Sequence, residues 1–466
     1  MNSINQAQKV GSPGALAARA AAASERNRRR LVNLVWLYFV LLILEGTLRK
    51  WVFPEWSNAL LIVRDPVAGL ILYLGLRDGY VPMGGLMRRL RWVPLAFVLL
   101  ATVQLTVYHV PASTLLFGLR TFFLHPPVIF VIARVLDARD LRRLVIAILV
   151  LAGPIAFLMV AQFRASPADW INLGVGAGGR QLLSAMNRVR PAGPFSFITG
   201  PVCYFSLLLA CLITAHVNRL RISPIVEACG WMAMLVATSV SGSRALAFGL
   251  VPVLLAVVVV LARRPVLTGT LLRSVVIAAT VVMTVWGSTA ISEGLAVFDA
   301  RMQQSGGVHN LVRRSTDTYT QAVSAFIETP AWGLGLGLGT NAGSALADRP
   351  AFGFGEGEWS RVLYEAGSIL GAAYLAWRVW LCTWLFRLSW RAASAGAVLP
   401  MTVFGATVLN LLLGQWGQPN MQGFAVFAAG LCLAACHVAG VDRVPRPGLA
   451  PAWAGPLRQP SPPAPV

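Results

Sequence analysis

Two arginines in a turn-rich segment could bind a phosphate group. Arg188-Val-Arg190-Pro-Ala-Gly-Pro leads directly into an apolar run. Guanidinium groups placed there would lie at the depth of lipid headgroups, where each can hold phosphate oxygens through two charge-assisted hydrogen bonds. The alternative is that both side chains only extend their charges to the membrane interface.

A second pair of arginines opens a helix that we expect from about residue 311 to 328, ended by Thr329-Pro330. Arg313 and Arg314 would lie in its first turn, where positive charge opposes the helix dipole by a few tenths to ~1 kcal/mol. An anionic partner would explain this arrangement. A solvated helix end would also be compatible with it.

Glu358, Arg361 and Glu365 share one face at the start of a further expected helix, because they are spaced by three and four positions. The helix dipole favours an ionised carboxylate at a helix N-terminus, and a general base must be ionised. We therefore take Glu358 as a candidate base. The alternative is a capping carboxylate with a surface ion pair.

Further charges lie inside apolar runs, where each costs at least ~2.5 to 3.5 kcal/mol and marks a candidate functional site. These intramembrane or membrane-end groups are Glu45, Arg49, Arg64, Asp65, Arg120, His125, Gln104, Tyr108, Arg244, Asn410 and Gln415. Their shared depth predicts a polar cavity that opens on the outer side. The alternative is that Glu45 with Arg49, and Arg64 with Asp65, are structural ion pairs.

The sequence contains no motif typical of nucleotide binding or of metal binding. The segment from Gly333 to Gly343 fits neither Gly-x-Gly-x-x-Gly nor a phosphate-binding loop, and we interpret it as a re-entrant or hinge turn rather than an anion-binding loop. The six cysteines fall in apolar runs without Cys-x-x-Cys spacing, and the five histidines are scattered. We expect no metal and no cofactor.

These side chains must be positioned by membrane-spanning helices. The composition is 56% hydrophobic and 12% charged, with a mean hydropathy of +0.66, outside the range of soluble domains. The net charge of +21 could suggest nucleic acid. The arginines instead cluster between apolar runs, as the positive-inside rule describes, so we expect no nucleic-acid partner.

The expected fold is an all-α polytopic bundle of about twelve transmembrane helices with both termini cytoplasmic. The predicted spans are 31–50, 57–76, 92–109, 112–134, 141–163, 197–217, 222–241, 244–262, 270–291, 361–386, 398–416 and 421–440. They separate a basic tail at 1–30, a transmembrane region at 31–441 and a Pro-rich tail at 442–466. The loops at about 164–196 and 292–360 would lie outside the cytoplasm, the larger between the ninth and tenth helices.

Several of these segments together resemble the O-antigen ligase and polymerase superfamily of bacterial surface polysaccharide synthesis. The resemblance rests on Arg190-Pro-Ala-Gly193-Pro-Phe, Ser-Gly-Ser-Arg244-Ala, Thr-Pro-Ala-Trp-Gly-Leu-Gly-Leu-Gly and Glu358-Trp359-Ser360-Arg361-Val-Leu-Tyr-Glu365-Ala-Gly367. Glu45-Gly46-Thr-Leu-Arg49-Lys50-Trp51-Val-Phe-Pro54 and Arg64-Asp65-Pro66 look like an exopolysaccharide branch. The chain departs from the family where many ligases carry a His-Asn pair, because residues 356–359 read Glu-Gly-Glu-Trp.

The resemblance implies transfer of an undecaprenyl-diphosphate-linked glycan to a sugar hydroxyl at the outer face of the inner membrane, without nucleotide or metal. Glu358, Arg190 and Arg313 would be catalytic, the arginines stabilising the leaving diphosphate. The expected substrate-binding residues are Arg188, Arg314, Arg361, Glu365, Arg244, Arg64 and Arg120. Expected partners are the glycan donor, a glycan acceptor, membrane lipids and other polysaccharide export or assembly proteins.

Two other classes of membrane protein are also compatible with the sequence. Twelve helices with both ends inside also describe a secondary transporter or flippase for a polysaccharide precursor or other anion, although no paired repeat is visible. A non-enzymatic assembly scaffold would leave the outward arginines without a chemical role.

Overall fold

The computed structural model of the chain describes residues 13–81, 92–176, 178–218, 220, 222–263, 269, 289–304, 307–348 and 357–442. These residues form a helical bundle in which the regular elements are all helices, and two isolated β-bridges lie in the loop that follows residue 164. The predicted fold class is confirmed: the protein is an all-α multi-pass membrane protein.

Eleven apolar helices of the described chain correspond to predicted spans. Eight are long enough to cross a membrane: Ala21–Val52, Pro54–Arg77, Ala112–Val135, Ala138–Arg164, Thr199–Val217, Arg244–Arg263, Glu358–Ser394 and Pro419–Val438. Three shorter apolar helices are Trp92–Thr106, Pro224–Val240 and Leu399–Leu413. The predicted span at 270–291 lies almost wholly outside the described residues, as does most of the predicted C-terminal tail.

The first helix is longer than predicted. Helix α1 covers Pro13–Thr47, so the described part of the expected N-terminal tail is helical rather than a separate segment. Its Ala-rich sequence has high helix propensity. Arg28 also holds this extension against the bundle through an ion pair of 2.7 Å with Asp140, at the start of α8 (Ala138–Arg164). A π-helical turn, Leu48–Val52, follows α1 and buries Arg49 and Lys50.

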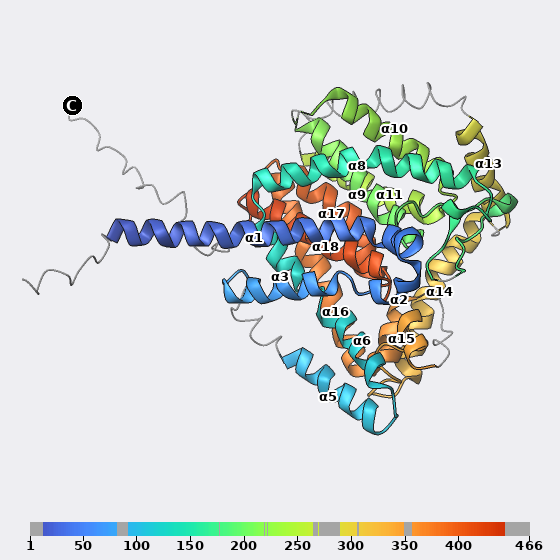
Figure 1. Cartoon of the computed structure of the whole chain (residues 1–466), viewed down its shortest axis with the longest axis horizontal. Helices are drawn as coiled ribbons and strands as arrows, with labels where there is room; N and C mark the ends of the chain where they lie inside the picture. Colours follow the sequence, from blue (N-terminus) through green and yellow to red (C-terminus); the bar gives the residue numbers. More distant parts are fainter. Residues whose placement is uncertain are drawn as a thin grey trace, which may run out of the picture.

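The C-terminal helix α18 (Pro419–Val438) lies at the centre of the bundle and is almost wholly buried. It packs against α7 (Val128–Val135), α9 (Thr199–Val217), α16 (Glu358–Ser394) and α17 (Leu399–Leu413) (Figure 1). Small residues allow this close approach, because a Cβ atom at Gly430 would meet the Ile132 side chain at 2.7 Å.

The remaining helices surround this centre (Figure 1). They are α2 (Ser57–Leu60), α3 (Asp65–Arg77), α5 (Trp92–Thr106), α6 (Ala112–Phe123), α10 (Pro224–Val240), α11 (Arg244–Arg263), α13 (Thr289–Gln304), α14 (Gly307–Glu328) and α15 (Asn341–Leu346). Helix α14 ends at Glu328, as predicted, and packs along α16. In Figure 1, α1 enters from the left, whereas α2, α13 and α14 gather on the right, so elements of the larger predicted loop lie where α1 ends.

The Gln104 side chain makes three of the hydrogen bonds that hold the glycine-rich segment before α15 and the start of α16 together. Gln104 of α5 donates to the carbonyls of Trp332 (2.7 Å) and Glu365 (3.0 Å), and its Oε1 accepts from the Leu336 amide (2.8 Å). Gly335 and Gly337 adopt positive φ angles, which glycine permits without a Cβ clash. The segment is therefore a packed turn that lies against the first turns of α16, whereas the prediction of a re-entrant or hinge turn stays a prediction.

Candidate functional site

A polar cavity of about 400 Å³ lies at the end of the bundle where α1 ends and α16 begins. Its wall combines both predicted outer loops with the start of α16 and the turn between α17 and α18. The described lining is Arg49, Leu61, Val175, Ser196, Phe197, Thr199, Gly339, Thr340, Asn341, Ala342, Gly357, Glu358, Arg361, Gln415, Gly417, Gln418, Pro419 and Asn420. This volume is within the range of small-molecule sites, roughly 300–1,000 Å³.

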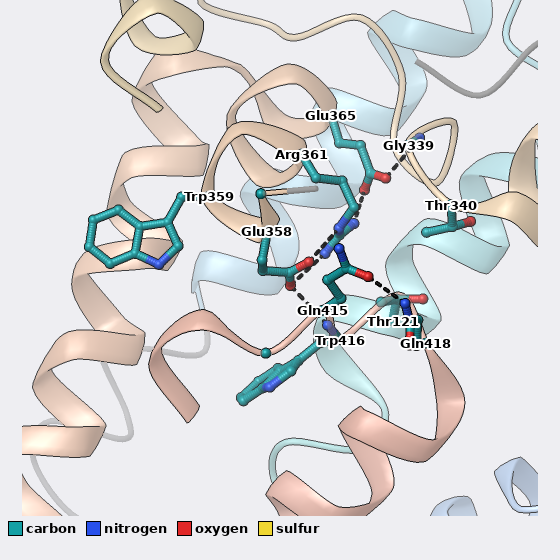
Figure 2. Close-up of polar contacts among 12 residues, drawn as sticks. Thr121, Gly339, Thr340, Glu358, Trp359, Arg361, Glu365, Gln415, Trp416 and Gln418 are labelled. Carbon is teal, nitrogen blue, oxygen red and sulfur yellow. Dashed lines mark hydrogen bonds and ion pairs between the residues drawn. The ribbon is translucent and has the colours of Figure 1, made fainter. Parts of the chain in front are cut away.

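Glu358 is the carboxylate of the described lining, and four hydrogen bonds hold it, of which Figure 2 shows those from Arg361 and Trp416. Arg361 donates to both of its oxygens at 2.7 and 2.9 Å, Arg378 donates at 2.9 Å, and the Trp416 amide donates at 3.1 Å. A carboxylate that accepts from two guanidinium groups is a weak proton acceptor. The geometry favours a positioning role for Glu358, which orients both arginines.

Arg361 is held between two carboxylates. Besides its paired bonds to Glu358, its Nη1 lies 2.8 Å from Glu365. Glu365 also accepts from the Gly339 amide at 3.0 Å (Figure 2). The one-face spacing predicted for these three residues is confirmed. Glu365 is fully buried and lies behind the cavity wall, where it fastens α16 to the glycine-rich turn.

Arg378 completes this cluster and was not among the predicted site residues. Its side chain donates to the carbonyls of Leu411 (2.8 Å) and Gly414 (2.9 Å) and lies 4.2 Å from the Trp416 ring. It is 1% exposed. The sequence could have indicated Arg378, because an arginine in the middle of an apolar run requires a partner for its charge.

Arg49 supplies a second guanidinium group to the cavity and carries surplus charge. It donates to the Ser57 carbonyl at 2.9 Å and pairs with Glu45 at 3.1 Å. Glu45 pairs at the same distance with Arg64, so one carboxylate compensates two cations. Around Glu358 and Glu365, by contrast, two carboxylates compensate Arg361 and Arg378. Among the described ion pairs of the site, the uncompensated positive charge therefore lies on the Arg49 side.

Arg64 reaches across the bundle instead of pairing with its neighbour. The alternative of an Arg64–Asp65 ion pair is wrong, because Arg64 binds Glu45 and the Pro419 carbonyl at the start of α18 (2.5 Å). Asp65 pairs with Arg120 and lies 3.0 Å from His125. Adjacent residues on a helix point in different directions, so each finds a partner on another helix. The alternative of a Glu45–Arg49 pair is confirmed.

Room for Arg64 depends on Gly423, because a Cβ atom there would overlap its Nη1. We expect Gly423→Ala to lower the free energy of unfolding by about 1–3 kcal/mol through overpacking, measured by thermal unfolding of the purified protein. Gly153→Ala is the control, since a Cβ atom at Gly153 meets nothing within 4 Å. Equal stability of the two variants would contradict this packing argument.

Three other predicted site residues, Arg188, Arg190 and Arg244, are not part of the described cavity lining. Arg188 forms an ion pair of 2.9 Å with Glu293 of α13. Arg190 is half-buried in the bridged loop, where its amide donates to Leu182 at 2.8 Å. Arg244 is the first residue of α11. Arg313 and Arg314 lie on α14, but their side chains are outside the described part of the chain.

The structure thus contains a cavity near the predicted polar groups, but fewer of them line it than expected. Arg49 and Gln415 line it. Glu45, Arg64 and Gln104 are buried behind its wall, where they hold helices and loops together. Asn410 likewise donates to the Met421 carbonyl at 2.9 Å.

The described residues contain no group of three or more histidine, cysteine or acidic side chains that could hold a metal ion. Comparison of the sequence with models of known protein families gives no match. A search of curated proteins likewise finds no significant relative.

Proposed function

We propose that the protein is a membrane glycosyltransferase that transfers or polymerises an undecaprenyl-diphosphate-linked oligosaccharide at the outer face of the bacterial inner membrane. The observation that carries this proposal is the cavity in which Arg49, with surplus positive charge, and Arg361 share a wall with uncharged hydrogen-bonding side chains. A diphosphate needs preorganised cations, and a glycan needs hydroxyl and amide partners.

An apolar groove beside the cavity supports a lipid-linked substrate. It lies between α14 and α16 and is lined by Tyr319, Ala322, Val323, Phe326, Trp359, Leu363, Ala372, Leu375, Ala376, Val379 and Trp380. Its volume is about 610 Å³. Glu358 lines the cavity and its neighbour Trp359 lines the groove, and Figure 2 shows the two side chains pointing apart from the first turn of α16. A substrate with its diphosphate beside Arg361 could therefore lay its isoprenoid chain in this groove.

The proposed reaction forms a bond between the acceptor hydroxyl oxygen and the anomeric carbon, while the bond from that carbon to the diphosphate breaks. The electron pair leaves with the diphosphate, where Arg49 and Arg361 stabilise the developing negative charge. The acceptor proton needs a base. Glu358 accepts only one of its four hydrogen bonds at Oε2, but its two guanidinium partners make it a weak base, so we assign Glu358 first to positioning and only second to the proton.

A direct test uses purified protein with lipid-linked oligosaccharide from cells that lack this protein. We expect longer or transferred glycan together with released undecaprenyl diphosphate. A secondary transporter or flippase would instead move the intact lipid-linked compound across proteoliposomes without breaking the sugar–phosphate bond. That result would overturn the enzyme proposal.

The proposed orientation predicts that reporter fusions near residues 175 and 345 are extracytoplasmic, whereas fusions near 85 and 265 are cytoplasmic. The reason is the alternation of arginine clusters with apolar spans. Paired alkaline phosphatase and fluorescent-protein fusions would measure it. A cytoplasmic signal near 345 would contradict both the orientation and an outward cavity.

A further inference from the structure

One part of the cavity wall carries no charged side chain. It is formed by the segment that enters α9 and by the turn that begins α18. Thr199 donates to the Gln418 side chain at 3.1 Å. Gln418 donates in turn to the Gln415 side chain (Figure 2). These hydroxyl and carboxamide groups differ from Arg49 and Arg361 in that they can both donate and accept hydrogen bonds. They suit a polar, uncharged ligand.

Asn420 in this wall has an unused acceptor. The residue is 3% exposed, and its Oδ1 is buried without a hydrogen-bond partner among the described residues. A buried carboxamide oxygen without a partner is costly, because it has lost water and gained nothing in return. A ligand that satisfies it must bring an O–H or N–H donor. A diphosphate offers almost only acceptors at neutral pH, whereas every pyranose ring carries hydroxyl donors.

Phe197 adds an apolar surface to the same wall. Its neighbours Phe195 and Ile198 are buried, but Phe197 is 41% exposed and lines the cavity. An aromatic ring presented within a polar site provides a flat contact area for the C–H face of a sugar ring. The combination of an unpaired acceptor and an exposed ring matches the two kinds of surface on a pyranose.

We propose that Asn420 and Phe197 form the subsite for an uncharged sugar of the glycan, next to the cations that hold the diphosphate. This inference rests on the proposed function and assigns its sugar specificity to two particular residues. Asn420 accepts a hydrogen bond from a sugar hydroxyl, and Phe197 stacks on the ring. The two residues therefore govern affinity for the glycan and not affinity for the lipid diphosphate.

The test compares three probes on the purified full-length protein: undecaprenyl diphosphate, the lipid-linked oligosaccharide accumulated by cells that lack the protein, and the same oligosaccharide released from its lipid. Asn420→Leu keeps the side-chain size but removes the acceptor, and Phe197→Ala removes the ring. We expect each variant to weaken binding of both glycan probes about three- to tenfold, as for a lost neutral hydrogen bond. Binding of undecaprenyl diphosphate should stay unchanged.

Two controls separate this role from a change in folding. Phe157→Ala removes a ring that is 77% exposed on α8, outside the described cavity lining, and Asn58→Leu changes an exposed carboxamide on α2. Both should bind all three probes like wild type. Asn420→Leu should also melt no lower than wild type, because it removes an unsatisfied buried oxygen. If Asn420 served only to stabilise the fold, Asn420→Leu would melt at a lower temperature than wild type.

The outcomes distinguish the inference from the proposed function. Equal weakening of all three probes, or wild-type glycan binding by both variants, would overturn the sugar subsite. If wild-type protein binds the glycan but transfers none, the enzyme proposal fails while the subsite stands. Absence of any glycan binding by the wild type would overturn both.

Discussion

Glu358→Gln is expected to lower the free energy of unfolding by about 3–5 kcal/mol, although glutamine has nearly the shape of glutamate. From the sequence alone, normal folding is expected for this variant, because glutamine is nearly isosteric with glutamate. In the structure Glu358 is fully buried between Arg361 and Arg378. Removing the charge of Glu358 leaves the buried Arg378 without a carboxylate partner. Arg361 then keeps only Glu365 as its carboxylate partner.

Thermal and denaturant unfolding of the detergent-solubilised protein would measure this effect, with yield in the membrane as a second readout. A double variant, Glu358→Gln with Arg378→Met, should recover much of the loss, because it removes the uncompensated cation together with the carboxylate. The matched control outside the cluster is Asp78→Asn, which breaks the Arg77–Asp78 pair at the end of α3; because solvent screens Arg77, the variant should keep close to wild-type stability. Wild-type stability of Glu358→Gln would contradict the buried-cluster assignment.

Arg49→Lys is expected to lower the rate of glycan transfer roughly a hundredfold or more while leaving the protein folded. Lysine keeps a positive charge but loses the planar guanidinium group, which in arginine can bind Ser57 and Glu45 and still offer a further N–H edge to a phosphate oxygen. In the structure Nε and Nη1 of Arg49 contact Ser57, Glu45 and Ser196. Within the described residues, Nη2 is thus the edge of the guanidinium group left for a ligand.

Steady-state assays with the lipid-linked donor would check this, with inhibition by undecaprenyl diphosphate as the readout that a structural role would not move. We expect Arg49→Lys to be inhibited much less strongly than wild type. Arg77→Lys is the control, because Arg77 pairs only with its exposed neighbour Asp78 among the described residues and lies outside the cavity lining. Arg190→Lys, in the same assay, decides whether the arginine predicted from sequence contributes to diphosphate binding. Unchanged rate and inhibition for Arg49→Lys would remove Arg49 from the proposed site.

The sequence by itself determined the fold class and most helices, since long apolar runs in lipid can satisfy their backbone groups only as helices. It also determined that Glu358, Arg361 and Glu365 share a face, and that α14 ends before Thr329-Pro330, because local spacing and proline geometry decide both. It identified several intramembrane charges of the site, including Arg49 but not Arg378. The glycosyltransferase assignment remains a proposal that rests on the resemblance and on the cavity.

Only the tertiary structure decided which of those charges meet. Arg64 pairs with Glu45, 19 positions away, and Arg378 joins Glu358 across 20 positions, because the partner of a buried charge is chosen by helix packing and not by sequence distance. Sequence spacing gave no reason to place Arg49 and Arg361 in one cavity or to leave Arg188 on the surface. The unpaired oxygen of Asn420 and the exposed ring of Phe197 were likewise invisible in the sequence, since burial and a missing partner are properties of the folded arrangement alone.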